Sequence, residues 1–324
     1  METVSLGRSG LRVSRLCLGT MLFGSQCDEA SSFAIMDEAA ELGIDFFDLA
    51  DVYPSPPGPE TWGRTEEIVG RWLGGRRERV VVATKCVNRV GPGPNDQGGS
   101  RKHVIEACER SLRRLRTDRI DLYYLHHSDL GAPMAETVEA LDRLVRDGKV
   151  LYVGVSNFEA WHLGLAMTVI AERRLARIVA LQPRYNLLHR PAERDLLPLA
   201  RAAGIGVVPY NPLAGGMLTG RYRRGAPPPE GSRFARGDWG RMYQGRYWAD
   251  RMFDVAEAVE VVAAGEGLTQ TQVALAWLLA RDGVTSPIVG ASRPGQLRES
   301  AAAVGRCLAE ASLARLDEVS RVFV

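Results

Sequence analysis

Four ionisable side chains of different kinds lie at or just beyond the ends of apolar runs in the sequence: Asp48, Tyr53, Lys85 and His126. An unperturbed phenol has a pKa of about 10, which is too high for easy proton donation at neutral pH. A buried ammonium beside the phenol lowers that pKa, and a carboxylate keeps the ammonium charged. A neutral imidazole can hydrogen-bond the oxygen that receives the proton. These residue types favour reduction of a carbonyl group, with a bound cofactor supplying the hydride because no side chain can.

The elements that must position these residues follow a repeating pattern of short apolar runs and stretches of helical periodicity. Eight such runs occupy residues 16–18, 45–48, 80–83, 120–125, 151–155, 178–181, 206–209 and 287–289. Helical stretches such as 31–42 and 101–115 lie between them, and Gly43 and Gly148 are helix stop signals. Eight strand–helix units predict an α/β fold, a (β/α)8 TIM barrel, rather than an open sheet. We expect residues 1–324 to form a single domain.

Two further segments are expected outside the regular barrel. The N-terminal stretch TVSLGRSGLRVS reads as a β-hairpin that closes the bottom of the barrel. The gap between the seventh and eighth runs is about twice the others, which predicts a long loop insertion after strand 7, about residues 213–252. Because active sites of such barrels lie at the C-terminal ends of the strands, the four ionisable residues should share one mouth of the barrel.

Some neighbouring residues have simpler structural interpretations. Adjacent residues of a strand face opposite sides, so we expect only one of His126 and His127 to point into the barrel. Asp51 is expected to be a surface or capping residue. Solvated or capping roles are also expected for His103, His162 and His189.

Composition excludes several classes of function. Lys and Arg number 41 against 39 Asp and Glu, a net charge of +2, so we expect no nucleic-acid and no membrane partner. Five scattered cysteines without a Cys-x-x-Cys pair, no signal peptide and no long apolar run predict a soluble, cytoplasmic protein. The sequence has no Gly-x-Gly-x-x-Gly or P-loop motif, and no His-x-His for a metal-dependent barrel hydrolase. We expect no metal site.

At these residues the sequence resembles the aldo-keto reductase family. The matching segments, in the family's order, are LCLGTMLFG, GIDFFDLADVY, RTEEIVGRWL, VVATK, DLYYLHH, KVLYVGVSNF, LQPRYN, PYNPLAGGMLTGRY and PIVGASRPGQLRES. The resemblance implies a (β/α)8 barrel that binds NADP(H), with Tyr53 as proton donor, Lys85 held by Asp48, and His126 orienting the carbonyl. It also selects His126 as the histidine that points into the barrel, so we expect His127 to lie in an outer layer or a loop. Loop segments look closest to the bacterial branch and to the potassium-channel β-subunit-like members.

The resemblance also implies a set of cofactor contacts. Arg293 is the candidate for the 2′-phosphate of NADP(H), because a guanidinium suits bidentate phosphate contact. Leu49 departs from the Thr or Ser usual after the aspartate, and Ser300 stands where the family commonly has Asn. The cofactor contacts implied are Gly19, Thr20, Met21, Asp48, Ser156, Asn157, Gln182, Tyr210, Asn211, Pro212, Leu213, Ala214, Gly216, Leu218, Gly220, Arg221, Arg233, Gly290, Ser292, Arg293, Gln296, Glu299 and Ser300.

The sequence therefore predicts an NADPH-dependent oxidoreductase that reduces a small aldehyde or ketone to an alcohol. Two alternatives stay open. One is a cofactor-binding, redox-sensing regulatory subunit with little turnover, similar to the channel β-subunits. The other is a specialised reductase of a keto-sugar or another secondary metabolite. The sequence makes no prediction of the oligomeric state.

Overall fold

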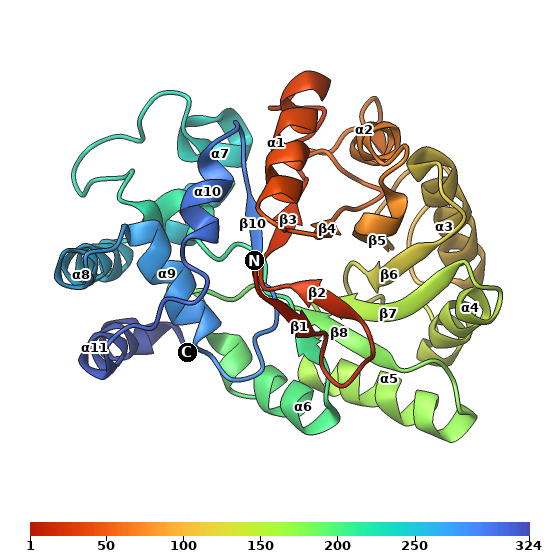
Figure 1. Ribbon diagram of the computed structural model, residues 1–324. Coiled ribbons are helices and arrows are strands. Elements are labelled where there is room, and N and C mark those ends of the chain that lie inside the picture. The colour runs from red at the N-terminus through yellow and green to blue at the C-terminus, as the bar shows by residue number, and fades with distance from the viewer.

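The computed structural model describes residues 1–324 as a barrel of eight parallel strands surrounded by helices (Figure 1). The strands run in the order β10-β3-β4-β5-β6-β7-β8-β9. A bridge between Val207 and Val284, and a 2.9 Å hydrogen bond from Ile288 N to Pro209 O, join β9 to the segment that leads into β10. The strands are β3 Cys17–Gly19, β4 Phe46–Asp48, β5 Val81–Cys86, β6 Ile120–Leu125, β7 Val150–Ser156, β8 Ile178–Gln182, β9 Gly206–Val207 and β10 Ile288–Gly290. Each overlaps one of the eight predicted runs, so the predicted barrel is confirmed.

Helices cover the outside of the barrel, and local signals in the sequence fix where several begin. Asp28 and Ser100 accept hydrogen bonds from backbone N–H groups of the first turns of α1 and α3, and Thr269 with Gln272 forms a capping box at α9. None of the helices is long and apolar enough to cross a membrane. Their bounds are α1 Glu29–Glu41, α2 Arg64–Trp72, α3 Arg101–Leu115, α4 Met134–Arg146, α5 Ala160–Arg173, α6 Leu196–Ala203, α7 Gly237–Tyr247, α8 Asp250–Glu266, α9 Gln270–Leu279, α10 Gln296–Ala301 and α11 Glu310–Ser320.

The predicted hairpin is confirmed as β1 Thr3–Ser5 paired with β2 Arg12–Ser14, and it lies across one end of the barrel (Figure 1). Leu6 and Val13 of the hairpin pack with side chains from inside the barrel, among them Phe46 and Leu122. Gly7 makes the closure possible, because its φ is 58° and a Cβ there would lie 2.4 Å from Gly204 O. This end is filled by apolar side chains, so only the opposite mouth is available for chemistry. The expectation that the chain is a single domain stays a prediction.

The insertion after the seventh barrel strand is present, but it is not simply a loop. It contains α7, which the sequence analysis did not predict, and buries Phe234, Tyr243 and Tyr247 in a second apolar core with α8 and α9. Three glycines within α7 weaken its helical signal, so packing of its aromatic face, rather than intrinsic propensity, stabilises it.

Three side chains expected at the surface are buried, and those expectations were wrong. Asp51 is 1% exposed, and neither of its carboxylate oxygens has a hydrogen-bond partner. Burial first, and then the nearby Glu66, raise the pKa of Asp51 well above its usual range. His103 is fully buried on α3 with Nδ1 on Asn95 O, and His162 is buried beside Phe158. The residues next to these three side chains in the sequence do not show how closely the surrounding helices and loops pack in the fold.

Candidate active site

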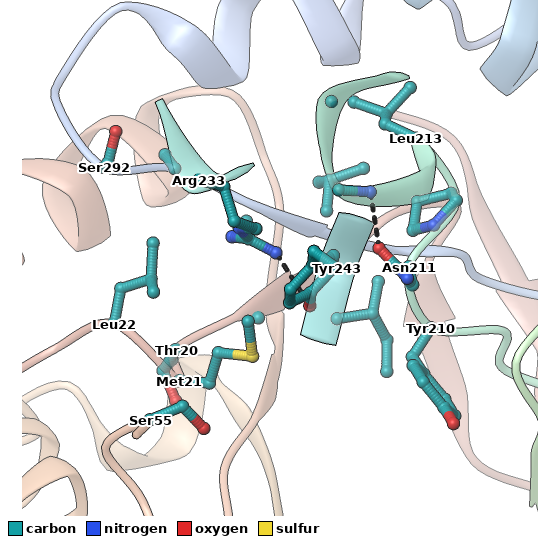
Figure 2. A pocket seen from close by; sticks show the side chains of 18 of the residues that line it. Thr20, Met21, Leu22, Ser55, Tyr210, Asn211, Leu213, Arg233, Tyr243 and Ser292 are labelled. Atoms are coloured by element: carbon teal, nitrogen blue, oxygen red, sulfur yellow. Dashed lines mark hydrogen bonds between the residues drawn. The ribbon is translucent and has the colours of Figure 1, made fainter. Parts of the chain in front are cut away.

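A cavity of about 890 Å³ opens at the C-terminal ends of the barrel strands. Side chains that follow β3 line one side, residues that follow β9 line the other, and Arg233 and Tyr243 of the insertion extend between them (Figure 2). Asp48, Tyr53 and His126 also line this cavity. Parallel strands direct all their C-terminal ends to one mouth, which is why residues from distant parts of the sequence meet there.

Asp48 and Lys85 form an ion pair beneath the cavity. Lys85 Nζ lies 2.6 Å from Asp48 Oδ2 and 2.6 Å from Leu49 O, and the lysine side chain is 0% exposed. Gln182 Nε2 donates to the other carboxylate oxygen, Oδ1, at 2.8 Å, so the pair ties β4 and β5 to β8 across the barrel. Burial is the largest single effect and would lower the pKa of Lys85, but the opposing effects of Asp48, Tyr53 and Cys17 together raise that pKa overall. The lysine is therefore held charged.

Tyr53 lies above this pair in the loop after β4. Lys85 Nζ is 5.0 Å from the centroid of the Tyr53 ring. Hydrogen bonds from Tyr53 N to Ala50 O and from Ser55 N to Met21 O hold the loop against the strand ends. Burial raises the pKa of Tyr53, and the lowering effect of Lys85 only partly opposes it. The effect of the lysine was expected from the sequence but the larger effect of burial was not, so the phenol is more firmly protonated than expected.

His126 follows β6, and its ring meets the Tyr53 ring edge-on with centroids 5.8 Å apart. Burial first, and then the nearby Lys85 and His127, lower the pKa of His126 well below its usual range, which keeps the imidazole neutral. His127 also lines the cavity. His127 lies in the loop after β6, as expected, because the strand ends at Leu125.

Polar side chains at the ends of β7 and β8 form a connected network. Asn157 donates through Nδ2 to His126 O and to Ser156 Oγ, and its Oδ1 accepts from Tyr210 Oη at 2.8 Å. Ser156 Oγ donates to Gln182 O at 2.9 Å. The network fixes these donors and acceptors at the strand ends, where a planar polar group could hydrogen-bond with them.

Arginines surround the remainder of the cavity. Arg233 stacks over the rings of Trp239 and Tyr243 and donates to Tyr243 Oη at 3.1 Å. None of the cavity arginines forms an ion pair with a carboxylate, whereas Arg223 and Arg224 outside the cavity pair with acidic residues of α8. Unpaired guanidinium groups make this end of the cavity suited to a polyanion. The lining arginines are Arg221, Arg233, Arg236, Arg246 and Arg293.

The cavity brings together nearly all of the residues singled out in the sequence. Lys85 lies beneath it, while Ala214 and Leu218 are buried in the second apolar core and Gly220 packs against Gln270. These four do not line it. The predicted residues that do are Gly19, Thr20, Met21, Asp48, Tyr53, His126, Ser156, Asn157, Gln182, Tyr210, Asn211, Pro212, Leu213, Gly216, Arg221, Arg233, Gly290, Ser292, Arg293, Gln296, Glu299 and Ser300.

Sequence reasoning missed several lining residues, among them Asn88, Arg236, Met242 and Arg246. Arg236 and Arg246 belong to the insertion after strand 7, which is rich in basic and aromatic residues. That composition could have indicated that the insertion contributes cavity residues. Nothing in the sequence near Asn88 marked it, because its position depends on a turn of the backbone after β5.

Comparison with known proteins identifies the family. The sequence model of the aldo/keto reductase family matches residues 15–321. The chain belongs to this family. It is 42% identical to "Uncharacterized oxidoreductase YrpG" of Bacillus subtilis (strain 168), over 98% of this chain and 96% of the relative. It is 37% identical to "Probable voltage-gated potassium channel subunit beta" of Arabidopsis thaliana, over 94% and 91%. It is 35% identical to "L-glyceraldehyde 3-phosphate reductase" of Escherichia coli (strain K12), over 96% and 90%.

Membership makes the protein an oxidoreductase of the aldo/keto reductase type, which acts on carbonyl compounds. A small-molecule carbonyl substrate fits the size of the cavity and its position at the barrel mouth. Nicotinamide cofactors are typical of this family, and the arginine-lined end of the cavity has the charge that such a dinucleotide needs.

Proposed function

We propose that this aldo/keto reductase uses NADPH to reduce an aldehyde or ketone to an alcohol, with Tyr53 as the proton donor. The observation that carries the proposal is the buried Asp48–Lys85 ion pair beneath Tyr53, with neutral His126 beside the phenol. A buried ammonium 5.0 Å from a phenol ring can stabilise the phenolate that remains after proton transfer.

The residues around the cavity fit a nicotinamide dinucleotide. Ser156, Asn157 and Gln182 would hold the carboxamide, and Tyr210 would lie against the ring. Gly19, Thr20 and Met21 would contact the nicotinamide ribose. When bound, the cofactor supplies the hydride for the carbonyl carbon.

The phosphate groups would lie among the arginines. Arg293 lines the cavity without a carboxylate partner, and we assign it to the 2′-phosphate, which favours NADPH over NADH. Arg221 and Arg233 would neutralise the pyrophosphate near the loop after β9. The remaining contacts proposed are Asn211, Pro212, Leu213, Ala214, Gly216, Leu218 and Gly220 in that loop, and Gly290, Ser292, Gln296, Glu299 and Ser300 around the adenosine.

The proton step follows from the electrostatics of the site. Burial keeps Tyr53 protonated until negative charge develops on the substrate oxygen, because it raises the pKa of the phenol. As the proton leaves, Lys85 offsets the charge of the phenolate, and Asp48 keeps Lys85 charged and in place. His126 is neutral, so it can donate one hydrogen bond to the same oxygen without competing as an acid.

A second candidate is a regulatory subunit that binds the cofactor and turns over slowly. The observation that favours it is the similarity to proteins named as potassium channel β-subunits. The complete set of Asp48, Tyr53, Lys85 and His126 favours turnover instead.

Two measurements test the proposal. The first is fluorescence titration with NADPH and NADH, followed by cofactor oxidation against a panel of aldehydes, ketones and keto-sugars. Tight NADPH binding with turnover is expected, and binding without turnover of any substrate would favour the regulatory candidate. The second is Tyr53→Phe, which should lower kcat by at least ~100-fold while NADPH still binds, the scale of a general acid. Near-normal turnover of this variant would remove Tyr53 from the mechanism.

A further inference from the structure

Asn88 lies in the loop after β5 and reaches the far side of the His126 ring. Its Nδ2 is 2.6 Å from His126 Nδ1, the ring nitrogen on which a neutral imidazole can either carry or lack its proton. The side chain also lines the active-site cavity, three residues beyond Lys85. Asn88 is therefore the one side chain hydrogen-bonded to the ring of His126.

The backbone that presents Asn88 is strained. Val87 has a φ of 97°, in a region that β-branched residues rarely adopt. Two hydrogen bonds hold this conformation: Gly98 N donates to Val87 O at 2.8 Å, and His126 N donates to Cys86 O at 3.0 Å. The loop and the residue that follows β6 therefore hold Val87 in its strained conformation. Val87 in turn sets the direction in which the Asn88 side chain leaves the backbone.

We propose that Asn88 is a positioning residue that donates a hydrogen bond to His126 Nδ1 and so places the only ring proton on Nε2, the nitrogen that can donate to the substrate oxygen. The proposal rests on the reaction proposed above, in which His126 donates to that oxygen. It adds the reason why the histidine is in the donating tautomer.

The groups around the His126 ring keep it neutral, so one of its two nitrogens must be left without a proton. The charged and titratable groups that face it are Lys85, Tyr53 and His127, and two of them oppose a positive ring. The imidazole is thus neutral, with one proton to place on either nitrogen. A carbonyl acceptor at Nδ1 would put that proton on the wrong side of the ring for the substrate, whereas the Asn88 N–H leaves it on Nε2.

Histidine-selective ¹⁵N NMR measures the tautomer directly and does not depend on activity. The wild-type protein should show His126 protonated on Nε2, with the signal assigned by its loss in His126→Gln. Asn88→Asp, which replaces the donor by an acceptor of the same shape, should move the proton to Nδ1 or raise the pKa of the ring. Asn88→Leu should give a mixture of tautomers. A wild-type ring protonated on Nδ1, or a tautomer unchanged in both variants, would overturn the proposal.

Kinetics tests the consequence for the reaction. Asn88→Leu should lower kcat by about 10- to 100-fold, the scale for groups that orient a functional histidine, with little change in NADPH binding. Asn88→Asp should lose activity near neutral pH and regain part of it as the pH falls, because a doubly protonated ring again donates from Nε2. A merely structural role for Asn88 would give neither the recovery at low pH nor the tautomer change.

A matched control separates loop disorder from tautomer control. Asp96 holds the same loop by accepting from Gly93 N at 2.8 Å and has no hydrogen bond with His126. Asp96→Ala should leave the tautomer on Nε2; loss of that tautomer in this variant would refute a specific role for Asn88. If His126→Gln retains full kcat while the NMR result holds, the proposed role of His126 in the reaction fails and the assignment of Asn88 to its tautomer survives.

Discussion

Replacing Asp48 by Asn should expose the cost of burying Lys85. The substitution keeps the shape of the side chain and removes the charge that lies 2.6 Å from a lysine with no solvent exposure. Leu49 O is then the remaining acceptor that contacts Nζ. Breaking a buried ion pair from one side typically costs about 3–5 kcal/mol of unfolding free energy, because the remaining charge is uncompensated. We expect a loss of that size at neutral pH.

The same substitution should make stability depend on pH in a defined direction. In the wild-type protein the pKa of Lys85 is raised, so the lysine is protonated in both folded and unfolded chains at pH 7–9, and its contribution is lost only as the pH rises through the folded-state value. Without Asp48, burial lowers that pKa, and the unfolded chain binds a proton that the folded chain lacks. Stability of Asp48→Asn should then rise with pH, by at most about 1.4 kcal/mol per pH unit, between the lowered folded-state pKa of Lys85 and the pKa of a free lysine.

Urea denaturation followed by tryptophan fluorescence at several pH values gives both quantities. The double variant Asp48→Asn with Lys85→Met is the control, since it removes the buried ammonium and should abolish the pH slope and recover part of the stability. A slope in Asp48→Asn equal to that of the wild-type protein would refute the reasoning, as would a loss at neutral pH below ~1 kcal/mol.

Two further predictions address the cofactor and the packing. Arg293→Gln should weaken NADPH binding by about 10- to 100-fold, the scale of one charge-assisted hydrogen bond, and leave NADH binding unchanged; equal losses for both cofactors in a fluorescence titration would contradict the assignment. Gly70→Ala should destabilise the fold by about 1–3 kcal/mol, because the added Cβ would lie 2.2 Å from Arg114 O in α3. Gly164→Ala in α5, where nothing lies within 4 Å, should instead stabilise by about 0.5–1 kcal/mol in thermal or urea denaturation.

The repeat of strands and helices could be predicted because its signals are local. The run at 120–125 coincides with β6, and the helical stretch at 101–115 coincides with α3. In α3 the spacing of apolar residues indicates which face is buried, whereas β6 is buried on both faces and is marked by its apolar run. The helix α7 could not be predicted in this way, since its sequence is interrupted by Gly240 and Gly245, and it is stabilised by aromatic packing with residues distant in the chain.

The depth of burial was the main quantity that the sequence did not contain. Asp51, within the DLADVY segment, looked like a surface carboxylate, but the approach of α2 to the loop after β4 leaves it buried and without a partner. The same applies to the pKa of Tyr53, where the influence of Lys85 was foreseen and the larger influence of burial was not. Desolvation depends on every neighbour in three dimensions, and no spacing of residues along the chain reports it.

The sequence by itself determined the barrel, the hairpin that closes one end, and the mouth at which Asp48, Tyr53, Lys85 and His126 meet, because strand direction and the C-terminal ends of parallel strands follow from local periodicity. Only the tertiary structure decided how these groups are charged, that His127 also faces the cavity, and that Asn88 reaches Nδ1 of His126. Those features depend on one strained residue, Val87, on the point at which β6 ends, and on distances of a few ångströms between segments far apart in the chain.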